Sequence, residues 1–371
     1  MSATACFELH GVRVRMESEL PAFTEYARAA LEPFLTEDKG RFDIRSSVQW
    51  RESPPPRDGE PGGVGFDAIP WTRRPDRDLY VGGAGALWLR IDDFTDLQMK
   101  LAMRDESVEL TGRYFFHLSS GGTVESLQRL RHRSHLDELR GRRFSTLLYY
   151  FFYHPLLWWL SRGAGWNVLH GGAVSTRIGA VIFAGMPGCG KSTLTVSMLS
   201  DADQKMLSDN LLLHDGENVL AVPELLLLDE RSRKLAGAGA KRLVATGEQR
   251  VFARDAYRVG DVELAPRKAG VLLHVERASE FLLKPLVPRE SAARLRAANT
   301  MAKEVRRLSI MNEVLDVVSG ARRFDEPGAA DKLAAVVPSF LLQVPPVTDA
   351  VGFLKEKVLG ELFDVLAGDE V

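Results

Sequence analysis

The sequence predicts an α/β protein with an N-terminal α+β module and C-terminal helices. Two patterns support this fold class. Strand-like alternation with one helical stretch dominates the first part of the chain, whereas after residue 165 short apolar runs alternate with helical patterns. Between two of these elements, the segment Gly185–Ser192 fills the pattern G-x-x-x-x-G-K-[ST]. We expect four parts, over residues 1–145, 146–165, 166–280 and 281–371.

The N-terminal module, residues 1–145, is expected to be α+β. Residues 7–16 alternate in the manner of one strand, and Pro21–Leu35 places its apolar residues near one helical face. Further strands are expected at Arg41–Trp50, Tyr80–Ile91 and Ser107–Phe116. The stretch Glu52–Gly65 is rich in proline, glycine and charge, which predicts an exposed loop.

An aromatic apolar segment, Ser145–Ser161, forms the predicted connection over residues 146–165. It is short for a membrane span and contains His154 and Pro155, so we expect buried or interfacial helices and no membrane segment. The preceding stretch Arg129–Arg143 is locally basic but has no interleaved aromatic residues. This pattern favours a solvated helix face over a nucleic-acid site.

The overall composition points to an ordinary globular protein. The 371 residues include 48 basic and 50 acidic ones, a formal net charge of −2, which gives no electrostatic reason to expect a nucleic-acid or membrane partner. Two cysteines cannot form a disulfide framework, and the N-terminus lacks the pattern of a secretory signal. We therefore expect a cytoplasmic location.

The phosphate-loop domain is expected over residues 166–280, followed by a helical extension over 281–371. Its predicted strands are Val168–Ser175, Ala180–Ala184, Asn210–His214 and Gly270–Glu276. The predicted helices of both parts are Lys191–Leu199, Ser291–Leu308, Asp331–Leu342 and Val351–Leu366.

The glycine-rich loop predicts ATP and Mg²⁺ as ligands. Glycines let consecutive backbone N–H groups turn toward phosphate oxygens, and the helix N-terminus favours negative charge. Lys191 would reach the β- and γ-phosphates, and the Ser192 hydroxyl would ligate Mg²⁺. The expected nucleotide-binding residues are Gly185, Pro187, Gly188, Cys189, Gly190, Lys191, Ser192 and Thr193.

Asp209 follows the loop in the sequence, and the residues between them are enough for one helix and one returning strand. Asp209 ends an apolar stretch, where it can hold Mg²⁺ or accept the proton of an attacking hydroxyl. The alternative is a turn or cap residue, because Ser-Asp-Asn is a good turn triplet. We favour the functional interpretation.

Several segments together resemble the catalytic domain of HPr kinase/phosphorylase and its relatives. The resemblance covers about residues 165–280 and is carried by Leu169–Val174 (LHGGAV), the phosphate loop, Leu207–Asn210 (LSDN), Val222–Leu226 (VPELL), Gly237–Arg242 (GAGAKR) and Ala265–Glu276. It implies the fold that this family shares with ATP-dependent phosphoenolpyruvate carboxykinase. It also implies catalytic domains that assemble into homo-oligomers.

The resemblance assigns roles to three residues near the loop. His170 would lie near the transferred phosphoryl group, although on sequence alone a satisfied buried histidine is an equally good interpretation. Asp209 matches the first aspartate of the family's Asp-Asp pair, which activates the acceptor hydroxyl and positions Mg²⁺. The second position is Asn210, which can ligate Mg²⁺ through its carbonyl oxygen but brings no charge.

The sequence departs from the family at its E-x-R-G-L-G signature. The corresponding region, Leu228–Gly237, keeps only Glu230 and Arg231, as remnants of the signature or as surface charges. Because in the family the signature couples the kinase to its phosphate-driven reversal, we do not assume that this chain catalyses the reverse reaction. The chain resembles an HPr-kinase-related protein more than HPr kinase itself.

These features predict a Mg·ATP-dependent kinase in which Asp209, His170 and Lys191 are catalytic and Ser192, Asp209 and Asn210 hold the metal. The acceptor is a hydroxyl, of either a protein serine or a small-molecule alcohol. The alternative is an ATP-binding regulatory or scaffold module without turnover, which Asn210 and the incomplete signature favour. A carboxykinase-like lyase is weaker, because no oxaloacetate-binding arginines can be assigned.

Overall fold

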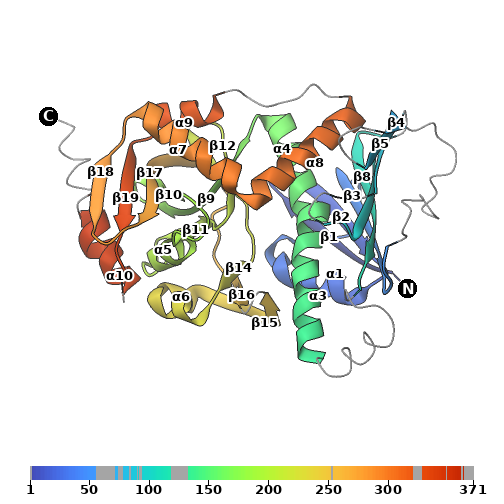
Figure 1. The fold of residues 1–371 in the computed structure, drawn as a ribbon, viewed down its shortest axis with the longest axis horizontal. Helices are drawn as coiled ribbons and strands as arrows, with labels where there is room; N and C mark the ends of the chain where they lie inside the picture. Colours follow the sequence, from blue (N-terminus) through green and yellow to red (C-terminus); the bar gives the residue numbers. More distant parts are fainter. Residues whose placement is uncertain are drawn as a thin grey trace. The chain divides into compact units, whose positions relative to one another are not determined.

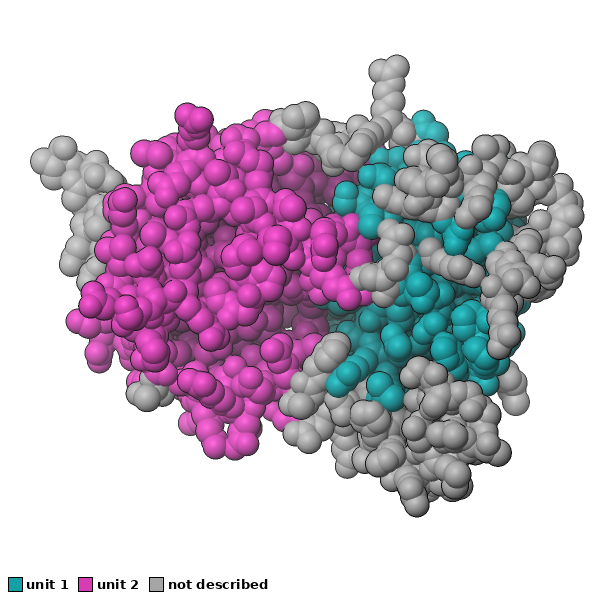
Figure 2. Space-filling view, viewed as in Figure 1, with its two compact units in different colours: residues 1–160, 308–324 teal, residues 161–307, 325–371 magenta. Residues whose placement is uncertain are grey.

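The computed structural model describes residues 2–55, 72–73, 78–82, 85–89, 91, 94–117, 133–251, 254–320, 328–347, 349–360 and 362. The chain divides into two compact units, coloured separately in Figure 2. Unit 1 comprises residues 1–160 and 308–324, and unit 2 comprises residues 161–307 and 325–371. Both units contain strands and helices, so the protein is a mixed α/β protein.

Unit 1 contains an eight-stranded sheet in the order β1-β2-β3-β8-β7-β6-β5-β4 (Figure 1). Its strands are β1 Ala3–Leu9, β2 Val12–Ser18, β3 Ile44–Arg51, β4 Thr72–Arg73, β5 Leu79–Gly82, β6 Gly85–Trp88, β7 Leu97–Arg104 and β8 Ser107–Phe115. Strand β3 pairs in parallel with β2 and with β8, and the other neighbours pair antiparallel.

Two strand predictions in unit 1 are wrong in their boundaries. The single strand predicted over residues 7–16 is a hairpin of β1 and β2, because His10 and Gly11 turn the chain with φ of 53° and 77°. The strand predicted over Tyr80–Ile91 is likewise divided between the antiparallel β5 and β6. The predicted Glu52–Gly65 loop lies outside the described residues from position 56 onward.

The aromatic segment is buried in unit 1, as predicted. Helix α3 (Arg133–Leu148) continues through a π-helical stretch, Tyr149–Tyr153, into α4 (His154–Ala164). Pro155 has no N–H to donate back to the preceding turn, and the Ser46 hydroxyl instead donates to the carbonyl of Phe151 at 2.6 Å. Within the described ranges, no helix has both the length and the apolar character to cross a membrane.

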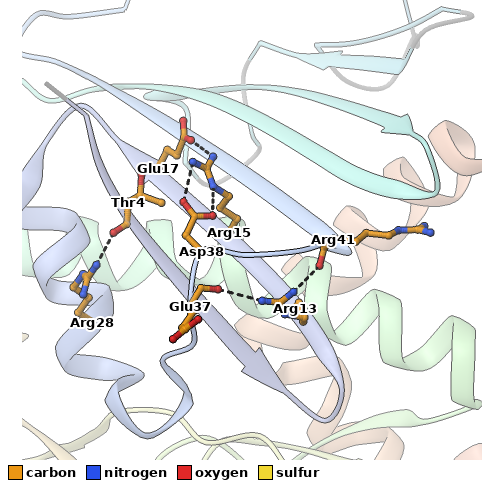
Figure 3. A network of polar contacts seen from close by, with 8 residues as sticks. All are labelled: Thr4, Arg13, Arg15, Glu17, Arg28, Glu37, Asp38 and Arg41. Carbon is orange, nitrogen blue, oxygen red and sulfur yellow. Dashed lines mark hydrogen bonds and ion pairs between the residues drawn. The ribbon is translucent and has the colours of Figure 1, made fainter.

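The loop after the first helix is attached to the β1–β2 hairpin by arginines (Figure 3). Helix α1 spans Pro21–Ala30 and a 3-10 turn follows at Glu32–Phe34. The Arg13 guanidinium donates to the carbonyls of Glu37 and Arg41, each at 3.1 Å, and Arg15 Nε donates to Asp38 at 3.0 Å. The Arg15 hydrogen bond lowers the pKa of the exposed Asp38 carboxyl.

Unit 2 is built on a second sheet, in the order β10-β9-β12-β13-β17-β19-β18, with β11 paired to β9. The strands are β9 Asn167–Thr176, β10 Gly179–Ala184, β11 Lys205–Ser208, β12 Leu211–His214, β13 Asn218–Ala221, β17 Arg267–Arg277, β18 Leu282–Pro285 and β19 Ser339–Val344. Strands β10, β17 and β19 are parallel neighbours, so their carboxyl ends meet at one edge of the sheet.

Helices cover both faces of this sheet (Figure 1). Helix α5 (Lys191–Met198) packs Leu194 and Val196 into the apolar cluster on one face. Helices α7 (Pro288–Met301) and α9 (Ala329–Val336) bring Leu295 and Leu333 to the cluster on the other face. The layered arrangement leaves the turn from β10 into α5 at the carboxyl edge.

The predicted C-terminal helices are only partly correct. The helix expected at Asp331–Leu342 ends at Val336, and β19 follows, because the apolar run after Pro338 supplies a central strand of the sheet. The helix expected at Ser291–Leu308 is divided at Ala302 between α7 and α8 (Lys303–Ser319). After α10 (Ala350–Phe353), a π-helical stretch covers Leu354–Leu359.

A small three-stranded sheet lies within the sequence of unit 2, in the order β14-β16-β15. Its strands are β14 Leu226–Leu228, β15 Leu243–Val251 and β16 Arg254–Val259, with helix α6 (Glu230–Leu235) and the 3-10 turn Gly239–Arg242 between the first two. Gly239 is required at the start of this turn, since a Cβ there would lie 1.9 Å from the carbonyl oxygen of Val196 in α5.

Arg242, at the end of that turn, satisfies carbonyl groups at and beyond the C-terminal end of α5. Its guanidinium donates to the carbonyls of Leu199, Asp201 and Gln204 and to the carboxylate of Asp261. Carbonyls at a helix C-terminus have no intrahelical donor, so a half-buried cation there stabilises the end of α5.

We predict that Arg242→Ala lowers the free energy of unfolding of unit 2 by about 2 kcal/mol, because it removes several charge-assisted hydrogen bonds. Thermal melting would show this as a lower midpoint. Arg289→Ala, which removes an exposed arginine of α7, is the matched control and should change stability by less than about 0.5 kcal/mol. Equal melting of R242A and wild type would contradict the assignment.

Candidate functional site

The predicted phosphate loop connects β10 to α5 at the carboxyl edge of the unit 2 sheet. Its glycines Gly185, Gly188 and Gly190 have φ of 147°, 82° and 109°, values that other residues rarely adopt. A Cβ at Gly185 would also lie 2.5 Å from the carbonyl oxygen of Val275 in β17. The loop conformation therefore depends on glycine at these positions.

Lys191 lies folded against this loop. Its side chain is buried, and Nζ donates to the carbonyl of Gly185 at 2.9 Å and to that of Met186 at 3.1 Å. Burial lowers the pKa of Lys191, while Cys189, Asp209 and Glu304 act in the opposite direction. The loop thus holds an ammonium group whose present partners are neutral carbonyls, which a phosphate oxygen can replace.

Asp209 lies beside the first turn of α5. Strand β11 pairs with β9 and ends at Ser208, so it delivers the next residue to the carboxyl edge. Burial raises the pKa of Asp209 to about 6, although a hydrogen bond with Ser192 and the positive charges of Lys191 and Arg254 oppose this rise. Its Oδ1 atom is buried and makes no hydrogen bond.

His170 faces Lys191 because β9 and α5 approach closely. A Cβ at Gly172 would lie 2.2 Å from Thr195 Oγ1, so only glycine permits this contact. His170 precedes Gly172 by two residues on the same face of β9, and Lys191 precedes Thr195 by one helical turn. The two side chains are therefore placed near each other, and the charge of Lys191 acts on the His170 ring.

The His170 ring is neutral near pH 7. Burial lowers its pKa, the charge of Lys191 lowers it further and polar groups of Asn210 oppose the fall, which leaves a pKa of about 4. The side chain is 6% exposed, and neither ring nitrogen makes a hydrogen bond of ordinary length and angle. A neutral imidazole offers one donor and one acceptor to a ligand.

Asn210 is fixed at both its backbone and its side chain. Its carbonyl accepts from Gly171 N–H at 3.0 Å, across from β9. Its Nδ2 donates to Glu224 Oε2 at 3.1 Å. Asn210 is thus bonded to the histidine strand through its backbone and to a carboxylate from another part of the chain through its side chain.

Three further residues were not identified from the sequence: Asn299, Glu224 and Arg254. Asn299 Oδ1 accepts from the backbone N–H of His170 at 2.8 Å, and Asn299 Nδ2 donates to the carbonyl of Val168 at 3.1 Å. No motif surrounds this asparagine, which comes from a distant helix. Glu224 belongs to the quoted VPELL segment, which was the only signal available for it.

The structure brings together the loop residues predicted at 185–193 with Asp209, Asn210 and His170. Glu230 and Arg231 do not join this group of residues. Both are exposed on α6, and Glu230 forms an ion pair with Lys234 at 2.6 Å. They are surface charges. In the described part of the chain, no three His, Cys, Asp or Glu side chains cluster as a self-sufficient metal site.

Comparison with known proteins adds no relative: no family model matches the chain, and no curated protein matches it. The interpretation of the site therefore depends on its own geometry.

Cys189 offers a chemical test of the loop. Its Sγ lies 4.0 Å from Lys191 Nζ, and 3.1 Å from the position a Cβ would take at Gly185. We predict that alkylation by iodoacetamide weakens ATP binding at least tenfold, because the added group enters the loop, and that prior Mg·ATP slows alkylation. Isothermal titration calorimetry and mass spectrometry measure the two effects.

Cys189→Ser is the control for this experiment and should bind ATP equally well with and without the reagent. The second cysteine, Cys6, is buried and burial raises the pKa of its thiol, so it should react slowly. Unchanged ATP affinity after complete alkylation of Cys189 would argue against the loop as the binding site.

Proposed function

We propose that this chain is a Mg·ATP-dependent kinase, of the phosphate-loop fold shared by HPr kinase and phosphoenolpyruvate carboxykinase, that phosphorylates a hydroxyl group. The observation that carries the proposal is the buried Asp209 carboxylate at the carboxyl end of β11, where Ser192 and Lys191 of the loop act to lower its pKa and its Oδ1 atom makes no hydrogen bond. A loop serine paired with a strand-end aspartate is the donor set by which phosphate-loop enzymes hold Mg²⁺.

The residues around this pair suit the nucleotide. Backbone N–H groups of Gly188–Thr193 would bind the phosphates, and Lys191 would exchange its two carbonyl partners for phosphate oxygens. Bound Mg²⁺ would neutralise charge on the β- and γ-phosphates. Ser192 and Asp209 would hold it, and Asn210 can contribute a carbonyl oxygen.

The acceptor side is formed by Asp209 and His170. The Asp209 carboxylate is positioned to take the proton of the attacking hydroxyl, and a pKa of about 6 keeps it ionised at neutral pH. The neutral His170 ring can orient the hydroxyl without adding charge. These groups suit a protein serine or a small alcohol equally well.

A second candidate is an ATP-binding regulatory module without turnover. The observation that favours it is the neutral Asn210, whose amide is already engaged with Glu224. A site with one carboxylate beside the loop binds Mg²⁺ less strongly than a site with two. Activity measurements on matched variants separate the two functions.

We predict that Asp209→Asn lowers the rate of phosphoryl transfer at least about 100-fold, because the base is lost. ATP should still bind, because the loop and Lys191 are unchanged. Purified protein with Mg·[γ-³²P]ATP would be tested against polyols, sugars and serine-containing proteins. Lys191→Ala is the companion variant and should lose ATP affinity as well. ATP consumption that no acceptor increases would count against the kinase, and ATP binding without any consumption across the whole panel would favour the regulatory module.

The pH dependence of the reaction provides a separate prediction. The pKa of Asp209 is raised, so the carboxylate is the major form only above about pH 6, and kcat/KM should fall tenfold per pH unit below that value. The contribution of Asp209 to the free energy of unfolding should rise as the pH falls from 6 to 4, because the folded state binds the proton more tightly than the unfolded state in this range. A kcat/KM profile that stays flat down to pH 5 would contradict Asp209 as the base.

A further inference from the structure

We propose that the small sheet of unit 2 binds an acidic segment of a polypeptide acceptor, through a cationic surface formed by Arg231 and Arg254 near the candidate site. This inference rests on the proposed function for the phosphoryl transfer that would follow. The binding itself requires neither ATP nor Mg²⁺ and can be measured separately.

The small sheet begins at the candidate site. Ser208 Oγ accepts from the Val222 N–H at 2.7 Å and donates to the Val222 carbonyl at 3.2 Å. Two residues further along each segment, Asn210 Nδ2 donates to Glu224 Oε2 at 3.1 Å. Strand β14 then starts at Leu226. The chain therefore runs directly from the site into the small sheet.

Two arginines lie together at the far end of β14. Strands β14 and β16 are antiparallel, and their register pairs Leu228 with Asp255. Asp229 and Arg254 are the next residues of the two strands, so they are cross-strand neighbours. Helix α6 begins directly after Asp229, which places Arg231 in its first turn. The two guanidinium groups therefore belong to one end of the sheet.

Both arginines keep their charge available for a ligand. Asp229, the carboxylate between them, caps α6 by accepting from the Ser232 N–H at 2.7 Å. Hydrogen bonds from Ser232 lower the pKa of Asp229, and the charges of Arg254 and Arg231 act in the same direction. Both arginines are exposed, and among the residues that the structure describes neither side chain forms an ion pair or hydrogen bond.

The surroundings of the two arginines are basic. The segment 229–259 contains eight basic and four acidic residues, in a chain whose formal net charge is −2. Arg233 and Lys241 are also exposed. The charge of Arg254 opposes the rise that burial causes in the pKa of Asp209, so the positive potential extends to the site. Such a potential attracts an acidic partner and raises its association rate.

The spacing of the charges favours an extended peptide over a small anion. Five residues separate Glu224, next to the site, from Asp229, and a strand of that length spans about 16 Å. A peptide whose serine lies at the site would reach the arginines with acidic residues within about five positions of that serine. A small anion would contact only one end of this distance.

The same surface is poorly suited to single-stranded nucleic acid. Such ligands are bound by cations together with exposed aromatic rings on which the bases stack. Tyr257, an aromatic residue of β16, is instead buried in the apolar cluster of unit 2. Charge complementarity therefore points to acidic side chains as the partner of the arginines.

The direct test is fluorescence anisotropy without nucleotide, with a labelled peptide in which one serine is flanked by aspartates and glutamates. The wild type should bind it at least about tenfold more tightly than the same peptide with asparagine and glutamine in their place. Arg231→Gln and Arg254→Gln should each weaken binding about fivefold. Arg289→Gln, which removes an exposed arginine of α7, is the matched control and should bind like wild type.

Charge reversal keeps the inference testable if a variant loses stability. The double variant Arg231→Glu, Arg254→Glu should prefer a peptide whose acidic residues are replaced by lysine, a gain that unfolding cannot produce. In the kinase assay, Arg231→Gln should raise the KM for the acidic peptide about fivefold with kcat unchanged, because it acts on binding alone.

Equal affinity of the wild type for the acidic and neutral peptides would overturn the inference. So would unchanged binding of the acidic peptide in the double variant Arg231→Gln, Arg254→Gln. Displacement of the peptide by an oligonucleotide of equal charge, or by inorganic phosphate, at the same concentration would assign the surface to another ligand. Because these measurements need no ATP, their outcomes are separate from a failure to find kinase activity.

Discussion

The close contact between β9 and α5 at Gly172 is the constraint on which the site depends. Thr195 occupies the space that a side chain at position 172 would need. This contact puts the first turn of α5, with Lys191 and Ser192, opposite the strand that carries His170. Any larger residue at position 172 would push the helix away, and overpacking of this kind costs about 1–3 kcal/mol.

The site buries three ionisable groups close together, so that burial and neighbouring charges both act on their pKa values. Lys191, Asp209 and His170 each pay a desolvation cost that shifts their pKa toward the neutral form, and the opposite charges of Lys191 and Asp209 offset part of it. An ammonium on neutral carbonyls and a carboxylate oxygen without a partner are groups that gain interactions when a phosphate and a cation bind. Under the proposed function, these groups would be preorganised for a phosphate and a cation.

The sequence predicts those parts of the site whose structure is determined by a short local sequence pattern. The glycine pattern locates the loop because only glycine adopts its φ values, and the strand-end position of Asp209 follows from chain geometry. Asn299 and Glu224 could not be assigned in the same way, since their roles come from tertiary contacts with no local pattern. In the fold, the segment after Pro338 is apolar enough for a helix or a strand, and only pairing with β17 and β18 decides it.

We propose that the loop, Lys191, Ser192 and Asp209 form one site for Mg·ATP. A crystal structure with Mg²⁺ and a non-hydrolysable ATP analogue tests it most directly. We expect phosphates on the loop N–H groups, Lys191 Nζ moved from the Gly185 carbonyl to a phosphate oxygen, and the metal between Ser192 and Asp209. A nucleotide bound elsewhere, with Lys191 still on the loop carbonyls, would contradict it.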